Sequence, residues 1–404
     1  MGSTTVIIGA GHAGGEAAIQ LRKAGYEGAI TIIGEEPYAP YERPPLSKDL
    51  LSGDMALERL FLRPAGYYAE HRIDILTGRR ASAIDRERQR VLLQDGEALA
   101  YDALIIATGA RVRRLPLPGA DLPGIHVIRT IDDTLALRPE MKAGARLAVI
   151  GGGYIGLEAA AVARKLGLEV TVFEAADRVM ARTASPPVSD FYAAYHRAQG
   201  VDIRLGQSIK GFAGDSHVTG IQTTDGETHA ADIVILCVGV IPNSDIAEAA
   251  GLTVDNGIVV DAHCRTNDPA IYAIGDVSRH PNPIYGDMLR LESVHNAMAQ
   301  ARIAALAITG QPEAYAEVPW FWSNQYDLRL QIAGVGGPGD EIVLRGEAGA
   351  PGFSVAHLRG GRLAALEAVN NPRDFMAAKK LIAAGTAVDA ARIADSATPL
   401  KDLL

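Results

Sequence analysis

The stretch Val6-Ile7-Ile8-Gly9-Ala10-Gly11-His12-Ala13-Gly14-Gly15-Glu16-Ala17-Ala18 decides the fold, because it predicts a buried strand that passes through a glycine turn into a helix. Its first residues are β-branched and apolar, as a parallel strand buried on both faces requires. In this G-x-G-x-x-G spacing, Gly9 allows the tight turn, Gly11 lets the backbone approach a pyrophosphate, and Gly14 lets the helix pack closely on the strand. The helix N-terminus then directs N–H groups towards the phosphates, so the stretch predicts a dinucleotide-binding site.

The same pattern recurs in Leu147-Ala148-Val149-Ile150-Gly151-Gly152-Gly153-Tyr154-Ile155-Gly156-Leu157-Glu158. Each motif is followed by a further predicted strand, at residues 30–33 and 168–173, and these strands lead to Glu35 and Glu174. An acid at this place accepts hydrogen bonds from a ribose. Two dinucleotides are therefore expected, and the protein is interpreted as a flavoprotein that a nicotinamide coenzyme reduces.

Composition and charge narrow the class of protein. The chain of 404 residues is 48% hydrophobic and 22% charged, which is ordinary for a globular protein of two or three domains. A net charge of −9 argues against nucleic-acid binding. No apolar run in the sequence reaches the length that spans a membrane. No leader peptide is expected before the first strand, so a cytoplasmic location is predicted.

The cysteines argue against electron transfer through sulfur. The chain has two, Cys237 and Cys264, without C-x-x-C spacing. No cysteine precedes Cys237, so the first nucleotide-binding region has no thiol to place beside a flavin. Electrons are therefore expected to leave the coenzyme directly for a partner. No metal site is predicted.

The fold class is predicted as α/β, with two Rossmann-like dinucleotide-binding domains and a C-terminal α+β domain. The predicted boundaries are 1–112 together with 244–318 for the first domain, 113–243 for the second and 319–404 for the third. Residues 102–109 and 232–239 share an order of acid, buried strand and glycine, so the first two domains are expected to be related. In the third domain we predict strands at 328–333, 341–344, 353–358 and 362–369, and a helix at 372–384.

Two further segments allow two interpretations each. Residues 37–48 are too rich in proline for a strand or a helix, and they form either a rigid loop that presents Arg43 and Lys48 to a planar ring or a plain surface loop. Between residues 58 and 90, eight arginines outnumber five acids. This excess predicts either a solvated face or a docking patch for an acidic protein.

Several segments together resemble the NADH-dependent ferredoxin reductases of bacterial oxygenase systems, which are glutathione-reductase-like flavoproteins without a redox disulfide. They are the paired glycine motifs, Tyr41-Glu42-Arg43-Pro44-Pro45-Leu46-Ser47-Lys48, Ala107-Thr108-Gly109, Ile274-Gly275-Asp276 and Pro319-Trp320-Phe321-Trp322. The resemblance covers essentially the whole chain. It implies non-covalent FAD in the first nucleotide site and NADH in the second.

The resemblance also implies which residues contact each coenzyme. For FAD, with Asp276 on the ribityl chain and Val294 near the flavin ring, they are Gly9, Gly11, His12, Ala13, Gly14, Glu35, Arg43, Lys48, Ala81, Ala107, Arg129, Asp276 and Val294. For NADH they are Gly152, Gly153, Tyr154, Ile155, Gly156, Glu158, Glu174, Arg182, Gly239 and Val240. The carboxylate of Glu174 repels a 2′-phosphate and so favours NADH over NADPH, although Arg178 and Arg182 follow closely.

The reaction implied by the resemblance moves a hydride from NADH to flavin N5 and then single electrons to an acidic 2Fe-2S ferredoxin that serves a monooxygenase or dioxygenase. Lys48 and Glu158 are expected either to meet near N5 as an ion pair or to be unrelated surface charges. Trp320 is expected either to cover a coenzyme or to be a core aromatic of the third domain. The expected protein is a monomer or weak dimer, and the expected docking residues for the ferredoxin are Arg63, Arg302 and Arg329.

Two other classes of protein fit the same motifs. One is an NADH oxidase or peroxidase, against which the missing thiol counts. The other is a flavoprotein like apoptosis-inducing factor, in which NADH binding changes the choice of partner without catalysis.

Overall fold

The structure, a computed structural model, describes residues 3–350 and 352–403 and divides into two compact units. Unit 1 comprises the described residues of 1–43, 57–111 and 241–319. Unit 2 comprises those of 44–56, 112–240 and 320–404. The second glycine motif, the C-terminal region and the short segment 44–56 therefore share one unit. The three domain boundaries drawn from the sequence stay a prediction.

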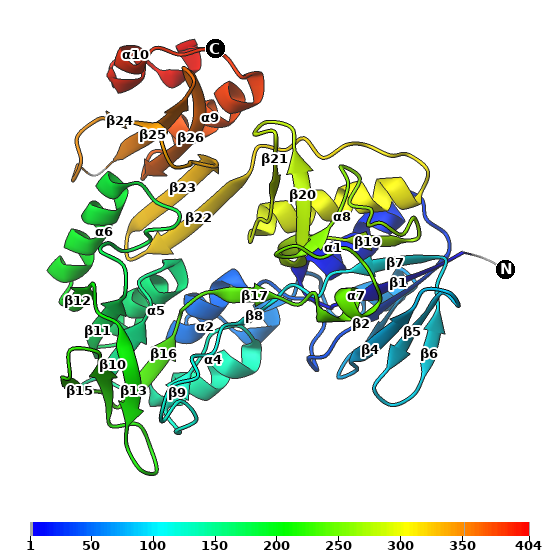
Figure 1. The fold of residues 1–404 in the computed structure, drawn as a ribbon, viewed down its shortest axis with the longest axis horizontal. Helices are drawn as coiled ribbons and strands as arrows, with labels where there is room; N and C mark the ends of the chain where they lie inside the picture. Colours follow the sequence, from blue (N-terminus) through cyan, green and yellow to red (C-terminus); the bar gives the residue numbers. More distant parts are fainter. Residues whose placement is uncertain (1–2, 351, 404) are drawn as a thin grey trace. The chain divides into compact units, whose positions relative to one another are not determined.

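Unit 1 is built on a parallel sheet with β1 at its centre. The strand order β19-β7-β1-β2-β3 runs through Ile271–Ala273, Ala103–Ile106, Thr4–Ile8, Ala29–Ile33 and Ile73–Leu76. On one face, Ile7 packs into a core with helices α1 (His12–Lys23) and α8 (Val294–Ile308), which lie side by side (Figure 1). Val6 and Ile8 enter the core on the opposite face. Because β1 is buried on both faces, its last three residues, Val6 to Ile8, are all apolar.

The opposite face of this sheet is covered by an antiparallel sheet and a short helix. The strands are β4 (Ala81–Asp85), β5 (Arg90–Leu93) and β6 (Ala98–Ala100), and the helix is α7 (Asp245–Ala249). Unit 1 also contains the sheet of β18 (Ile258–Val259), β20 (Ser278–Asn282) and β21 (Asp287–Leu289), and the short helices η2 (Leu57–Leu60), α3 (Tyr67–Glu70) and η4 (Gly275–Val277).

Unit 2 repeats the parallel arrangement around the second motif. The order β12-β11-β10-β16-β9 runs through Val201–Leu205, Glu169–Glu174, Arg146–Ile150, Ile233–Leu236 and Ile125–His126. In unit 1 the carboxylate of Asp102 accepts a hydrogen bond at 2.7 Å from Thr4 N, at the start of β1. In unit 2 Asp232 accepts one at 2.9 Å from Arg146 N, at the start of β10. The two segments that share acid, strand and glycine thus play the same role in each sheet.

Further elements of unit 2 surround this sheet. They are helices α4 (Ile131–Leu137), η3 (Arg138–Glu140), α5 (Tyr154–Lys165) and α6 (Pro186–Ala198), and the antiparallel strands β13 (Ile209–Ala213), β14 (Gly220–Thr223) and β15 (Thr228–Ala230). Two strands lie where the chain passes between the units, β8 (Ala110–Val112) and β17 (Val240–Pro242).

The C-terminal region forms an antiparallel sheet in the order β22-β23-β26-β25-β24, with helix α9 packed on β23 and β26. The strands are Trp320–Gln325, Leu328–Gly334, Arg362–Val369, Phe353–Arg359 and Glu341–Arg345, and α9 is Pro372–Ala384. Short helices α10 (Ala390–Ala394) and η5 (Leu400–Leu403) follow. The strands and the helix predicted here from turn residues and periodicity are confirmed.

One prediction about the proline-rich segment is wrong. Residues 44–52 form two short helices, η1 (Pro44–Ser47) and α2 (Asp49–Ser52), whereas the sequence predicted no helix up to residue 48. Proline is tolerated in the first turn of a helix, because the N–H that it lacks would have no partner there. The two prolines at the start of η1 therefore begin this short helix and do not prevent it.

Candidate active site

The first glycine turn, in unit 1, fits glycine for steric reasons. Gly9 has φ +114°, and a Cβ there would lie 2.2 Å from the carbonyl oxygen of Ala107, which follows β7. A Cβ on Gly14 would lie 1.9 Å from the carbonyl oxygen of Gly9. No side chain fits at either position, so α1 starts in close contact with the end of β1.

The space at the start of α1 suits a diphosphate. A Cβ on Gly11, the N-cap of α1, would meet only a guanidinium nitrogen of Arg43, at 4.0 Å, among the atoms described. Within α1 as the structure describes it, the N-cap makes no side-chain hydrogen bond and the first turn carries no acid. The first N–H groups of the helix are therefore free to bind an anion.

Arg43 is held at this turn by a network within unit 1. Its guanidinium donates to Glu36 at 2.8 Å and to the Tyr41 hydroxyl at 3.0 Å, while that hydroxyl donates to Glu36 at 2.6 Å. Burial lowers the pKa of Arg43, but the electrostatic interactions with Tyr41 and Glu36 outweigh it, so the net pKa is raised. The arginine is a fixed cation at the mouth of the turn.

Glu35, the acid that follows β2, remains largely in solvent. Its side chain is 68% exposed and pairs with Arg80 at 3.2 Å. Arg80 directly precedes Ala81, the first residue of β4, so this ion pair links the start of β4 to Glu35. The carboxylate is accessible to a ribose hydroxyl.

A second turn brings Asp276 to the start of α1. Gly275, with φ +74°, lies so close that a Cβ on it would be 3.0 Å from the Cβ of Ala13. Its N–H donates to the buried Gln300 at 2.7 Å, and the Asp276 carbonyl accepts from Arg290 at 3.2 Å. Val294 begins α8, which packs on α1. Gln300 has no motif around it, and sequence reasoning missed this role.

His12 lies in the same region, at the first position of α1. Burial lowers its pKa, an effect that the charge of Glu16 opposes. Its Nδ1 is buried and makes no hydrogen bond with the residues that the structure describes. The imidazole therefore offers a polar atom to a ligand or a water molecule.

The second glycine turn, in unit 2, repeats the geometry of the first. Gly151 has φ +105°, and a Cβ there would lie 2.4 Å from the carbonyl oxygen of Cys237, which follows β16. A Cβ on Gly156 would lie 2.2 Å from the carbonyl oxygen of Gly151. Gly153, the N-cap of α5, has no atom of the described chain within 4 Å of its Cβ position, so this turn also leaves room for a diphosphate.

Glu174 stabilises the second turn through two hydrogen bonds. One carboxylate oxygen accepts from the backbone of Gly152 at 2.7 Å and the other from Ala176 at 2.8 Å. The guanidinium of Arg178 donates to the carbonyl of Ala184 and to the hydroxyl of Ser189, so these donors are occupied within the protein. Arg182, in contrast, is exposed.

Gly239 and Val240 lie where the chain leaves unit 2. Gly239 has φ +93° with no described atom within 4 Å of its Cβ position. Its carbonyl accepts from Arg113 N at 2.9 Å. Arg129 precedes α4, and its backbone N–H donates to Asp133 at 3.1 Å.

Lys48 and Glu158 form a buried ion pair in unit 2. The Lys48 Nζ lies 2.6 Å from Glu158 Oε2, and the two side chains are 17% and 4% exposed. Ser47 donates to the same oxygen at 2.6 Å, and Ser323 donates to Glu158 Oε1 at 2.6 Å. The sequence suggested the pair but missed both serines, although Ser47 adjoins Lys48 in the chain. Glu158 lies on α5 two residues after Gly156, so a fixed charge pair stands beside the second glycine turn.

Trp320 belongs to an aromatic cluster of the C-terminal region. Its ring lies 5.4 Å from that of Trp322 and 5.8 Å from that of Phe375, and Lys379 Nζ lies 5.5 Å from its centre. The ring is partly buried among these neighbours. Whether it also covers a coenzyme stays a prediction.

The arginine-rich segment is not a free positive patch. Most of its arginines pair with acids, the pairs being Arg63–Glu16, Arg72–Glu27, Arg79–Glu97, Arg80–Glu35, Arg86–Asp268 and Arg88–Asp85. Many of these acids lie outside residues 58–90, where the count of local charges could not include them. The interpretation as a docking patch loses its support, since opposite charges on the same surface cancel its field.

The cysteines are free thiols and poorly suited to redox chemistry. Burial raises the pKa of Cys237 to about 12 and raises that of Cys264 further. Reactive cysteines instead have a lowered pKa and solvent access. Among the described residues there is no cluster of metal ligands and no helix long and apolar enough to cross a membrane.

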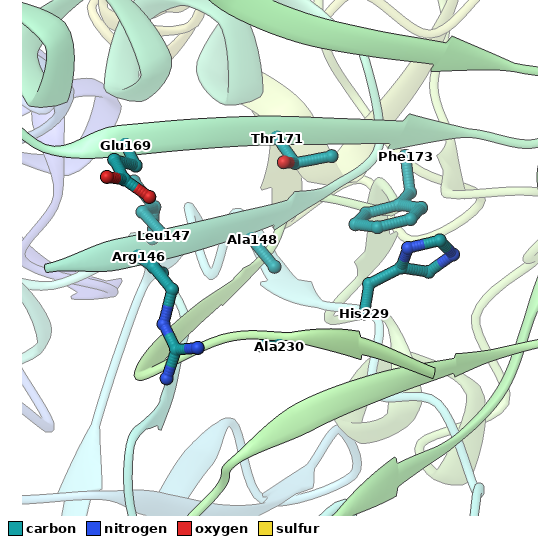
Figure 2. Close-up of a pocket in the computed structure, with 8 residues that line it drawn as sticks. All are labelled: Arg146, Leu147, Ala148, Glu169, Thr171, Phe173, His229 and Ala230. Atoms are coloured by element: carbon teal, nitrogen blue, oxygen red, sulfur yellow. The ribbon is translucent and has the colours of Figure 1, made fainter. Parts of the chain in front are cut away.

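A small cavity of unit 2 lies away from the second glycine turn. It is lined by Arg146, Leu147, Ala148, Glu169, Thr171, Phe173, His229 and Ala230 (Figure 2). Most of these residues come from the beginnings of β10 and β11, whereas nucleotides bind at the carboxyl ends of parallel strands. We assign this cavity no role in coenzyme binding.

Comparisons with known proteins agree with this geometry. The family model "Pyridine nucleotide-disulphide oxidoreductase" matches residues 3–301, and "Reductase C-terminal" matches residues 320–404. Rhodocoxin reductase of Rhodococcus erythropolis is 48% identical, covering 98% of this chain and 93% of that protein. The ferredoxin–NAD(+) reductase component of the anthranilate 1,2-dioxygenase system of Burkholderia cepacia is 44% identical, covering 99% of this chain and 98% of that protein.

A solved structure is also similar over the whole chain. In the covalent putidaredoxin reductase–putidaredoxin complex, the matching chain has a TM-score of 0.97 at 42% identity, with coverage of 99% of this chain and 98% of that chain. The two glycine turns fit the diphosphates of FAD and of a nicotinamide coenzyme, and the whole-chain similarity extends to the C-terminal sheet. The chain therefore belongs to the pyridine nucleotide-disulphide oxidoreductase family, and it is an oxidoreductase that uses FAD and a nicotinamide coenzyme.

Proposed function

We propose that the protein is an FAD-dependent NADH:ferredoxin oxidoreductase that supplies a monooxygenase or a dioxygenase with electrons through a 2Fe-2S ferredoxin. The observation that carries this proposal is the similarity, over nearly the whole chain, to reductases named for such electron-transfer systems. The raised pKa values of both cysteines support it, because a flavoprotein without a reactive thiol must pass electrons directly to its acceptor.

We assign FAD to the glycine turn of unit 1 and NADH to that of unit 2. When bound, FAD supplies a ring that accepts a hydride and releases electrons one at a time. The diphosphate of FAD would lie at the start of α1, with Arg43 as its cation and Glu35 on the adenosine ribose. His12, Ala107, Asp276 and Val294 would line the same side of the unit, as would the residues of the turn itself.

NADH is favoured over NADPH by the position of Glu174. Its carboxylate is held by two backbone N–H groups beside the second turn. The adenosine ribose of a coenzyme bound at this turn would lie beside that acid. There it accepts hydrogen bonds from a free 2′-hydroxyl and repels a 2′-phosphate. Arg182 is exposed nearby in the chain, but Arg178 is already bound within the protein.

The chain's own contribution to hydride transfer comes from Lys48 and Glu158. The buried carboxylate fixes the lysine ammonium, so that a positive charge has a defined place beside the turn assigned to NADH. A charge that the protein already holds in place stabilises charge that develops during the reaction without reorganisation. The protein otherwise binds the coenzymes and orients them.

The acceptor is proposed to be an acidic ferredoxin that docks through charge. Of the three predicted docking arginines, Arg63 pairs with the buried Glu16 and Arg302 pairs with Glu313. Arg329 is exposed on β23, and no ion pair of its side chain occurs within the described ranges. Arg329 is therefore the best of the three candidates.

The test is NADH oxidation by the purified, FAD-loaded protein with a series of 2Fe-2S ferredoxins. Fast ferredoxin reduction that weakens as salt increases supports the proposal, because transient redox interfaces depend on electrostatic steering. Hydrogen peroxide consumption with NADH would indicate a peroxidase instead. Failure to turn over any one-electron acceptor would indicate a non-catalytic flavoprotein. We also propose a cytoplasmic location, where NADH is available, which fractionation of the source cells would test.

A further inference from the structure

A chain of buried polar side chains leads away from the Lys48–Glu158 pair within unit 2. Ser323, which donates to Glu158, accepts a hydrogen bond from the amide of Gln325 at 3.1 Å. The side-chain amide oxygen of Gln325, Oε1, lies 2.8 Å from Nε2 of His196, on α6. Ser323, Gln325 and His196 are at most 1% exposed. Residues 323 and 325 alternate along β22, so both side chains lie on one face of the strand.

The hydrogen bonds that link these side chains all run in one direction, with each donor on the side of His196 and each acceptor on the side of Glu158. The amide nitrogen of Gln325 donates to Ser323, so the serine hydrogen is free to go to Glu158. The amide oxygen of Gln325 then faces His196, whose Nε2 must carry the hydrogen. Nδ1 is left as an acceptor, and the hydroxyl of Tyr326 lies 3.5 Å from it. Burial lowers the pKa of His196, which agrees with a neutral imidazole that has a single hydrogen.

This direction matters because Glu158 is a buried anion. Lys48 and Ser47 both donate to Oε2 of Glu158. Ser323 is the donor to Oε1 in the part of the chain that the structure describes. Ser323 therefore sets the rotation of the carboxylate about its last bond, and that rotation places Oε2 and the ammonium that Oε2 holds. Donors arranged in series polarise one another and strengthen the final bond.

We propose that Ser323, Gln325 and His196 are positioning residues for hydride transfer, acting through Glu158 on Lys48. The inference rests on the proposed function. It gives the C-terminal sheet a part in the reductive half of the reaction, because β22 supplies two of the three residues. These three residues need not touch a coenzyme, since their effect passes through the carboxylate.

The experiment uses the FAD-loaded protein and the limiting rate of flavin reduction by NADH in stopped flow. Ser323→Ala should lower this rate about tenfold, because a hydrogen bond to a buried charge is lost. The affinity for NAD⁺, measured by titration, should stay within about twofold, since the variant leaves the second glycine turn and Glu174 unchanged. Ser323→Thr keeps the hydroxyl and should restore most of the rate. Gln325→Leu removes the bond one step farther away and should lower the rate about threefold.

The matched control is Ser354→Ala in the same sheet. Ser354 is also fully buried and donates to a buried carboxylate, that of Asp374, at 3.0 Å. Its loss should destabilise the C-terminal region to a similar degree and leave the rate of flavin reduction unchanged. If both serine variants slow reduction equally, the effect is a general loss of stability and the inference is overturned.

A spectroscopic measurement tests the direction of these hydrogen bonds without turnover. Nitrogen NMR of the wild-type protein labelled in histidine should show His196 as a neutral imidazole with its hydrogen on Nε2. A hydrogen on Nδ1 would reverse the direction of the hydrogen bonds and overturn the inference, whether or not any variant folds. If NADH fails to reduce the wild-type flavin, the proposed function falls and this role falls with it. If wild-type reduction is fast and Ser323→Ala reduces equally fast, only this inference falls.

Discussion

Removing one member of the Lys48–Glu158 pair should be more harmful than removing both. The Nζ–Oε2 distance is 2.6 Å, at which two unit charges attract by about 6 kcal/mol for an effective dielectric constant of 20. Lys48→Met leaves Glu158, 4% exposed, with Ser47 and Ser323 as its side-chain donors among the described residues. Loss of one partner of a buried pair costs about 3–5 kcal/mol. Because Lys48 is 17% exposed, water reaches the site and we expect a value near the lower end, about 3 kcal/mol.

The double variant Lys48→Met/Glu158→Gln tests this reasoning. The double variant has no uncompensated buried charge, and the glutamine keeps an oxygen that accepts a hydrogen bond from a serine. Its loss of unfolding free energy should therefore be smaller than the sum of the two single losses by at least about 2 kcal/mol. Urea unfolding of the FAD-loaded proteins, followed by circular dichroism, gives the four free energies of the cycle. Flavin reduction by NADH should nevertheless remain about 10- to 100-fold slow in the double variant, because the fixed charge is gone.

Two results would refute this account of the pair. If the losses in unfolding free energy of the two single variants add up in the double variant, within about 0.5 kcal/mol, the two charges do not interact. A double variant that regains the wild-type reduction rate would mean that the pair serves stability alone. The same unfolding cycle on Arg302–Glu313, whose side chains are 42% and 55% exposed, is the control and should give a coupling of at most about 1 kcal/mol.

Three further predictions follow from other parts of the molecule. His280 is fully buried, and burial lowers its pKa from 6.5 to about 4, so the unfolded chain binds a proton first as pH falls. This histidine should therefore contribute a loss of about 2 kcal/mol of stability between pH 8 and pH 5. His280→Phe should remove that contribution in urea unfolding. Glu174→Ala should raise the ratio of kcat/KM for NADPH to that for NADH about tenfold, because the repulsion of a 2′-phosphate is lost; an unchanged ratio in steady-state assays would mean that specificity lies elsewhere. Arg329→Glu should weaken ferredoxin reduction at low salt without changing flavin reduction by NADH, and equal ferredoxin rates at all salt concentrations would exclude this residue from the docking surface.

Much of the fold could be predicted because its signals are local. The two glycine motifs specify turns in which a Cβ would collide with a backbone oxygen, at Gly9 and at Gly151, so each motif carries its geometry within a few residues. The buried strands and the C-terminal elements follow from periodicity and turn residues in the same way. Asp102 and Asp232 repeat at corresponding places because each bonds to the first residue of a glycine-motif strand.

The site depends on contacts between residues far apart in the sequence. Lys48 and Glu158 could be suggested from the resemblance, but Ser323 joins them from 165 residues beyond Glu158, and nothing local marks it. The segment 58–90 also depends on distant contacts. Its excess of arginines allowed either a solvated face or a docking patch, and the sequence could not show that Arg86 pairs with Asp268 across 182 residues or that other arginines pair with distant acids.

The sequence by itself determined the two nucleotide-binding turns, the type of the elements around them and the lack of a thiol relay. These features need only short-range sterics and the presence or absence of a residue type. Only the tertiary structure decided which charges are neutralised, which carboxylate is buried, and which hydroxyls hold it. Charge pairing and burial depend on which distant segments meet, and a one-dimensional pattern contains no record of those distances.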